Sequence, residues 1–253
     1  MDGWRTLSTR HGLWLMALWC LKWAVIAPGG VAWGDEPSPA FIELEVPPFY
    51  VATEAGLVSG PLGVDGLMAP AEDEFLAALE EVREHWSGQP AEVLFIGAIQ
   101  LYNRGFRHEA VRWFYTAQVR MHWFAAAVEP GQLLRPDSVA SVRMDAQEAF
   151  FRGASPFING FALRHPDGLI ALLAEIREAE AGLEAGDHAA PYEGVRFTDR
   201  DRWAEIQSGV LDGLDELAGL IRDQREAIAQ DREETGAAGQ FDTLESRELP
   251  RPE

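Results

Sequence analysis

The sequence predicts an all-α protein, a bundle of about six helices with an extended N-terminal arm. Apolar residues recur at three- and four-residue steps through most of the chain after residue 70, which is typical of helices with one buried face. Clusters of glycine and proline separate these stretches. With 253 residues, 47% of them apolar, the chain is long enough to bury its own core. We expect residues 70–232 to form this helical domain.

The first 34 residues have the layout of a secretory signal peptide. A short basic region precedes the apolar run 13–27, and Ala32 and Gly34 place small residues where signal peptidase reads them. Lys22 interrupts the run, which is shorter than the roughly 20 residues that span a membrane. We therefore expect cleavage before Asp35 and a periplasmic or secreted protein with no stable membrane insertion. The alternative is an uncleaved segment that anchors the chain.

Charge and cysteine content restrict the function further. The chain has 41 acidic and 21 basic residues, a net charge of −20. Such a field repels nucleic acid and favours a basic protein partner. The single cysteine, Cys20, lies in the predicted signal peptide, so the mature chain would have no thiol chemistry and no cysteine-ligated zinc.

Residues 35–69 are expected to form an extended arm and a loop. Ile42, Leu44 and Val46 alternate with glutamates, which favours a short strand or an extended segment. Pro47-Pro48 excludes a central strand. Residues 53–69 are rich in glycine and proline and show no helical period, so we interpret them as a surface loop.

Three helices follow. The first is predicted over 72–86, and the apolar residues of its inner stripe are Phe75, Leu76, Leu79, Val82 and Trp86. The next two, 91–103 and 107–128, are joined by a tight turn at Gly105.

This pair carries a resemblance to a known family. Gly105 at the turn, Ala110, the pair Trp113-Phe114 and Ala117 resemble the pattern of tetratricopeptide and Sel1-like helical repeats. The resemblance covers residues 91–128, about one repeat, and no second copy has the same spacing. It implies a helical hairpin of the kind used in protein–protein interaction, but a single repeat cannot form a solenoid.

The remaining helices are predicted in order. Asp137 is a suitable N-cap for a helix over 138–151, which Gly153–Pro156 should end before a short helical turn at 157–163. Another helix covers 168–183. Thr198 should cap a last long helix whose stripe continues to Ile228, with a disordered acidic tail at 233–253. The apolar positions of that last stripe are Trp203, Ile206, Val210, Leu214, Leu217, Ile221 and Ile228.

No residue pattern predicts a catalytic, cofactor or metal site. The histidines include no pair four residues apart, and neither a nucleophile elbow nor a phosphate-binding glycine loop occurs. One stripe of the 107–128 helix, made of Arg112, Trp113, Arg120 and Trp123, is the candidate partner-binding surface, because tryptophan and arginine dominate binding hot spots. The alternative is that these side chains pack against other helices.

We therefore expect a secreted or periplasmic helical protein–protein interaction module without catalytic activity. One alternative is an immunity or inhibitor protein that neutralises a cationic toxin or enzyme. Another is a hydrolase that uses two carboxylates on cell-wall glycan. Two acidic helix faces are further candidate docking surfaces for a basic partner. They comprise Glu72, Asp73, Glu74, Glu80, Glu81 and Glu84, and then Asp212, Asp215, Glu216, Asp223 and Glu226.

Overall fold

The computed structural model describes residues 39–43, 50–53, 56–59, 66–190 and 192–250, and this part of the chain is predominantly helical, which confirms the predicted all-α bundle. The predicted signal peptide lies outside the described residues. The elements are β1 (Tyr50–Thr53), β2 (Gly56–Ser59), α2 (Glu72–Glu84), α3 (Ala91–Asn103), α4 (Arg107–Ala127), α5 (Pro130–Leu133), α6 (Val139–Ala162), α7 (Pro166–Ala181), α8 (Trp203–Asp223), α9 (Arg225–Glu234) and α10 (Ala237–Phe241), with short 3-10 helices at 66–68, 86–88 and 200–202.

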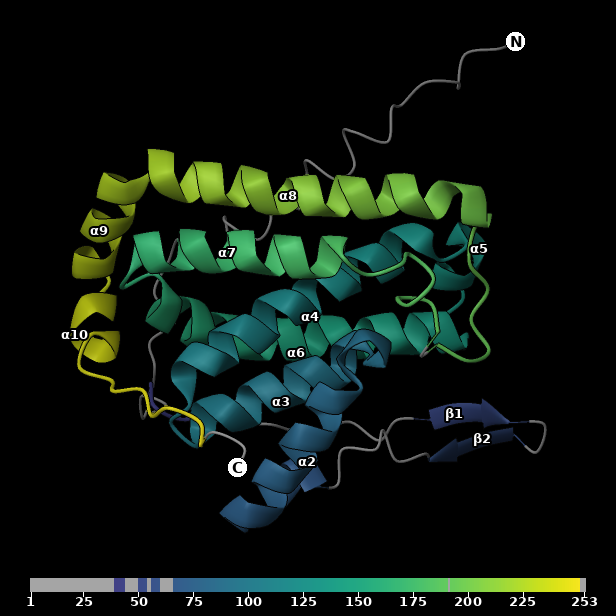
Figure 1. The fold of residues 1–253 in the computed structure, drawn as a ribbon, viewed down its shortest axis with the longest axis horizontal. Helices are drawn as coiled ribbons and strands as arrows, with labels where there is room; N and C mark the ends of the chain where they lie inside the picture. Colours follow the sequence, from purple (N-terminus) through teal and green to yellow (C-terminus); the bar gives the residue numbers. More distant parts are fainter. Residues whose placement is uncertain (1–38, 44–49, 54–55, 60–65, 191, 251–253) are drawn as a thin grey trace.

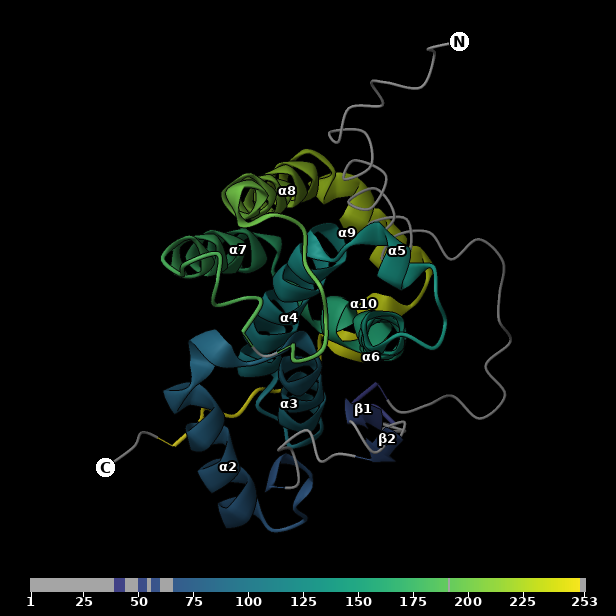
Figure 2. The same ribbon diagram turned by 90° about the vertical axis from the view of Figure 1, so that its right-hand side faces the viewer.

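Helix α4 is the centre of the bundle. It packs on α3 and α6, and α7 and α8 lie over it on the opposite side (Figure 1, Figure 2). Helices α9 and α10 turn down across one end of the bundle, and α2 lies below α3 (Figure 1). Helix α4 buries residues around its whole circumference, as a helix enclosed on all sides must. Its largest fully buried side chains are Trp113, Trp123, Phe114 and Phe124.

The α3–α4 hairpin forms where the sequence predicts it. Gly105 takes a left-handed conformation, with φ of 85°, and the Phe106 amide donates to the Leu101 carbonyl at 2.8 Å, which closes the end of α3. A second glycine permits the close approach of the two helices. A Cβ at Gly97 would lie 2.4 Å from the ring of Trp113, so this ring packs directly on the α3 backbone.

Helix α6 runs unbroken through the segment where the sequence predicts an end. The predicted break at 153–156 is wrong: α6 continues past Pro156 to Ala162. The apolar stripe stays in phase across the proline, because Ala154 and Ile158 are both fully buried, and this packing offsets the lost backbone hydrogen bond. The N-cap is also displaced by one residue, since the Ser138 hydroxyl accepts from the Ser141 amide at 3.0 Å.

The last predicted helix is divided in two. Thr198 does not cap it: its amide donates to the Ala127 carbonyl at 2.8 Å, beside a bridge between Val128 and Phe197. Helix α8 begins only at Trp203, and the chain bends at Gln224 between α8 and α9.

The predicted disorder of 233–253 is wrong for residues 233–250. Helix α9 continues to Glu234, and Phe241, 7% exposed, packs on Gly160 of α6. The segment after α10 passes the α3–α4 turn at the end of α3 (Figure 1). Three apolar residues, Phe241, Leu244 and Leu249, lie against the core and supply the packing that an acidic tail would lack.

Of the predicted arm and loop, the structure describes residues 39–43, 50–53, 56–59 and 66–69. Ile42 is 1% exposed, and its amide and carbonyl are both hydrogen-bonded by the Asn103 side chain, at 2.7 and 2.9 Å. Residues 44–49 lie outside the described part. The loop predicted over 53–69 is partly wrong, because β1 and β2 pair as an antiparallel hairpin in the register Thr53–Gly56.

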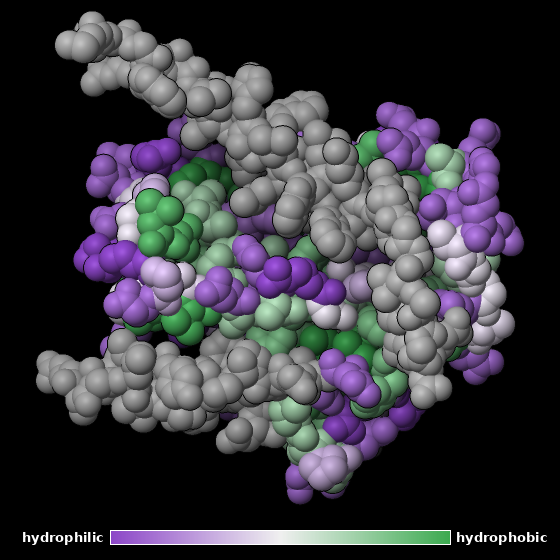
Figure 3. Space-filling model, turned by 180° about the vertical axis from the view of Figure 1, so that it is seen from behind, coloured by the Kyte–Doolittle hydropathy of each residue, from purple (hydrophilic) through white to green (hydrophobic). Residues whose placement is uncertain are grey.

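The described surface mixes hydrophobic and hydrophilic residues (Figure 3). Its exposed large hydrophobic side chains are Phe41, Met68 and Leu134, from three separate segments. Within the described ranges, no helix has the length and apolar character needed to cross a membrane.

Candidate functional site

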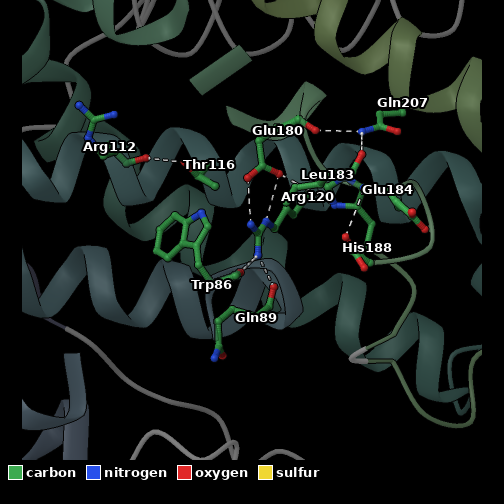
Figure 4. Close-up of polar contacts among 11 residues, drawn as sticks. Trp86, Gln89, Arg112, Thr116, Arg120, Glu180, Leu183, Glu184, His188 and Gln207 are labelled. Atoms are coloured by element: carbon green, nitrogen blue, oxygen red, sulfur yellow. Dashed lines mark hydrogen bonds and ion pairs between the residues drawn. The ribbon is translucent and has the colours of Figure 1, made fainter. Parts of the chain in front are cut away.

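A buried ion pair joins α4 to α7 at the centre of the molecule. Arg120 is 3% exposed and Glu180 is 1% exposed. The Arg120 guanidinium donates to both Glu180 carboxylate oxygens, at 3.2 Å from Nε and 2.9 Å from Nη2 (Figure 4). Its Nη1 donates to the carbonyls of Trp86 and Gln89, at 2.7 and 2.8 Å. Two charges removed from water are stable only when paired and hydrogen-bonded in this way.

A histidine lies against the same ion pair. His188 is 4% exposed, its Nδ1 is 3.9 Å from a Glu180 oxygen, and its ring lies 5.2 Å from that of Trp123. Burial lowers the pKa of His188 below its usual value of 6.5, and the Glu180 carboxylate opposes the shift only in part. His188 is therefore neutral at pH 7. Its Nδ1 and the Trp123 indole N–H are buried polar atoms without a hydrogen-bond partner among the described residues.

The structure contradicts the expectation that Arg112, Trp113, Arg120 and Trp123 form an exposed stripe. Trp113 and Trp123 are each 1% exposed, and Arg120 is 3% exposed, so three of the four side chains are buried. The ring of Trp86 packs edge-on against Trp113 at 5.0 Å, while α7 and α8 cover the remainder. These residues are part of the core, and a partner cannot reach them in this conformation.

Arg112 is the exception. Its side chain is 40% exposed and pairs with Glu175 of α7, with 2.6 Å between Nη2 and Oε2. In Figure 4 it points away from the Arg120 ion pair. A single exposed arginine that is already paired with a carboxylate does not make a binding surface.

A second buried carboxylate lies at the start of α3. Glu92 is fully buried and accepts from Arg143 of α6 at 3.3 Å, but its other oxygen has no partner among the described residues. Burial raises the pKa of Glu92, and Arg143 opposes this shift. Tyr192 lies beside it: the Tyr192 hydroxyl accepts from the Ala91 amide at 3.1 Å and from the Gln147 amide at 3.5 Å.

The two buried carboxylates do not resemble the catalytic pair of a glycan hydrolase. Glu92 and Glu180 are each enclosed by protein groups and bound by an arginine, so neither carboxylate faces solvent that a substrate could replace. Among the residues that the structure describes, no three histidine, cysteine, aspartate or glutamate side chains gather as a metal site requires.

The acidic face of α2 is the strongest exposed charge feature. The helix has six acidic residues and one arginine, and its buried stripe is Phe75, Leu79 and Val82. Four exposed carboxylates form no ion pair with any described residue; they are Asp73, Glu74, Glu81 and Glu84. We call these four residues the α2 acidic face. Arg83 lies off this face, because it reaches Glu109 of α4 at 2.7 Å.

The second predicted acidic surface, on α8, is partly neutralised. Asp212 and Asp215 are 65% and 60% exposed, but Arg177 of α7 lies 3.9 and 2.8 Å from their carboxylates. Glu216, Asp223 and Glu226 of the same surface are exposed and form no ion pair with a described residue, so three of its five carboxylates stay unpaired, against four on the α2 acidic face.

Sequence reasoning missed the residues that hold the core ion pairs. Glu180 and His188 occupy positions in a polar stretch near the end of α7, where nothing local distinguishes a buried carboxylate from an exposed one. The one available signal was Arg120, a charged residue between the apolar Val119 and Met121 in a helix that is buried around its circumference. Such a residue needs a buried partner elsewhere in the chain.

No protein-family model, curated protein or solved structure matches the chain. The resemblance of residues 91–128 to helical repeats therefore depends only on the residues that carry it.

Proposed function

We infer that this protein is an extracytoplasmic helical binding protein that recognises a basic partner through the α2 acidic face. The observation that carries the proposal is the set of four exposed carboxylates on α2 without ion pairs, in a chain of net charge −20. Surface charge of one sign steers a partner of opposite charge and selects its orientation.

The position of the face supports the same interpretation. Phe75, Leu79 and Val82 attach α2 to the body of the protein, so the carboxylates are presented on a fixed helix and need little ordering on binding. The buried aromatic residues of α4 argue against a scaffold that binds through an exposed tryptophan groove. Within the proposed class, an inhibitor of a cationic toxin or enzyme is the form that charge complementarity favours.

Affinity capture with matched variants tests the proposal. The bait is the mature chain, and the prey is the extracytoplasmic fraction of its source cells. The α2 variant carries Asp73→Asn, Glu74→Gln, Glu81→Gln and Glu84→Gln. The control variant removes the same number of charges from α8 through Asp212→Asn, Asp215→Asn, Glu216→Gln and Asp223→Asn.

The expected result is a basic protein, captured in stoichiometric amount by the unmodified chain and the α8 variant and lost with the α2 variant. Loss with the α8 variant alone, or no captured protein at all, would contradict the proposal. The location has its own test: N-terminal sequencing of the mature protein should begin near Asp35. A chain that begins at Met1 in the cytoplasmic fraction would exclude an extracytoplasmic function.

A further inference from the structure

The C-terminal residues 242–250, which we call the strap, lie across the α3–α4 turn at the end of the bundle where α10 ends (Figure 1). The Arg247 amide donates to the Gly105 carbonyl at 2.8 Å, and the Ser246 hydroxyl accepts from the His108 amide at 3.0 Å. Ser246 therefore caps the first turn of α4, which has no side-chain cap of its own. The strap is bound to the protein as an extended peptide.

The side chains beneath the strap are arginines. Arg164 donates to the Leu244 carbonyl, Arg107 donates to the Glu245 carbonyl, and Arg232 pairs with Asp242. We use the name arginine groove for these three residues, because the strap lies across them. It is a local concentration of positive charge in a chain whose acidic residues outnumber its basic residues by 41 to 21.

The strap does not provide an ion pair or a hydrogen-bond acceptor for every arginine group of the groove. Arg107 and Arg164 have no ion pair with any described residue, and their buried Nε–H groups have no hydrogen-bond partner there. Both guanidinium groups instead lie over aromatic rings, Arg107 over Tyr102 at 5.3 Å and Arg164 over Phe161 at 3.7 Å. Guanidinium groups bind carboxylates more strongly than they bind neutral carbonyls. A more acidic segment would therefore satisfy the groove better than the strap does.

Apart from Leu244 and Leu249, which lie against the core, the strap is held by exposed contacts that can open locally. Among the described residues, one ion pair joins the strap to α2: Arg247 lies 2.7 Å from Glu72, and both side chains are about half exposed. Glu245, Arg247 and Glu248 are exposed, and the segment has no helix or strand hydrogen bonds of its own. Short segments held by exposed backbone hydrogen bonds open at low free-energy cost.

We propose that the arginine groove binds an extended acidic peptide segment of a partner protein, and that the strap occupies this groove until the partner displaces it. The acidic segment places carboxylates on Arg107, Arg164 and Arg232, and an apolar side chain takes the place of Leu244. This site differs in position and sign of charge from the α2 acidic face, so the two can be tested separately.

The test uses the full chain and a labelled peptide with the sequence of residues 241–250 as the probe. A strap-released variant carries Phe241→Ser and Arg247→Ser. We expect this variant to bind the peptide at least about tenfold more tightly than the unmodified chain, because its groove is open. Adding Arg107→Gln and Arg164→Gln to the released variant should abolish binding, and a peptide of scrambled sequence should not bind.

Equal affinity of the released and unmodified chains would overturn the proposal, as would binding that survives loss of the two arginines. If the released variant instead forms a dimer by exchanging straps, the occupant is a second copy and the assignment to a partner peptide is wrong. If the strap-released variant with Phe241→Ser and Arg247→Ser fails to fold, Arg247→Ser alone serves as the test. This single change alters only a half-exposed contact, and it must raise the affinity for the peptide by a smaller factor.

Hydrogen exchange tests the proposal without any variant. The Arg247 amide must exchange faster than the amides of α3 and α4, and equal protection would contradict a displaceable strap.

Discussion

Helices α4 and α2 place their charges in opposite environments. Helix α4 carries Arg120 in the core, where both oxygens of Glu180 and two backbone carbonyls bind the guanidinium. Helix α2 carries six acidic residues, and four of them face solvent without an ion pair to a described residue. The charge of Arg120 is paired inside the protein, whereas the four carboxylates on α2 remain available to a partner. The comparison predicts that changes in α4 alter stability and changes in α2 alter binding.

Breaking the core ion pair should have the largest effect. Arg120→Met leaves Glu180 buried without its partner, and we expect the free energy of unfolding to fall by about 3–5 kcal/mol. Urea denaturation followed by circular dichroism measures this change.

A double variant provides the control. Arg120→Met combined with Glu180→Leu removes both charges, so it should cost less than the sum of the two single changes. Some loss must remain, because Arg120 also binds the carbonyls of Trp86 and Gln89. A loss below about 1 kcal/mol for Arg120→Met would show that the pair is not a buried, desolvated one.

Disturbing the close contact between α3 and α4 should have the second-largest effect on stability. Gly97→Ala places a methyl group where the Trp113 ring now lies, so the two helices must separate or the ring must move. We expect a loss of about 1–3 kcal/mol in the free energy of unfolding. The control is Gly213→Ala in α8, where a Cβ meets nothing within 4 Å. If Gly97→Ala were as stable as the control variant, the packing of Trp113 described above would be wrong.

The buried His188 predicts a smaller, pH-dependent effect. Because its pKa is lowered, the folded protein keeps His188 neutral where the unfolded chain, with a pKa near 6.5, takes up a proton. The stability contributed by neutral His188 is thus complete above pH 6.5 and is lost as the pH falls below it, by at most about 1.4 kcal/mol per pH unit.

The measurement compares the unmodified chain with His188→Gln at pH 7.5, 6.0 and 5.0. The difference in their free energies of unfolding should shift in favour of the variant as the pH falls. His122, whose pKa burial lowers to about 4, and Glu92, whose raised pKa acts in the opposite direction, are present in both proteins and cancel. A difference that stays constant over this range would contradict a neutral buried His188.

Sequence patterns predicted the elements whose signals are local. The bounds of α3 and the start of α4 follow from Pro90 and Gly105, which punctuate a strongly apolar stretch. The same local rules failed at Pro156, where burial of the flanking residues holds α6 together, and at Thr198, whose amide binds another segment.

The candidate site was predicted less well than the fold. An arginine and tryptophan stripe looks the same in sequence whether it faces a partner or a neighbouring helix, and only the packing of α3, Trp86, α7 and α8 against it decides between them. The strap was missed for a related reason. Its order depends on Arg107 and Arg164, which lie 138 and 80 residues earlier in the chain than the strap carbonyls they bind, together with a few apolar residues in an acidic context. The α2 acidic face was predicted because six carboxylates around one apolar stripe define both faces of a helix.

The most direct test of the contrast between α4 and α2 is the affinity of the captured basic partner for the unmodified chain and for the four-substitution α2 variant. Isothermal titration at low and high salt measures both affinity and its electrostatic part. The predicted result is a dissociation constant raised at least about tenfold and a weaker dependence on salt. The free energy of unfolding should change by less than about 0.5 kcal/mol, since the substituted side chains are exposed. An unchanged dissociation constant in a fully folded α2 variant would contradict the proposed function of this helix.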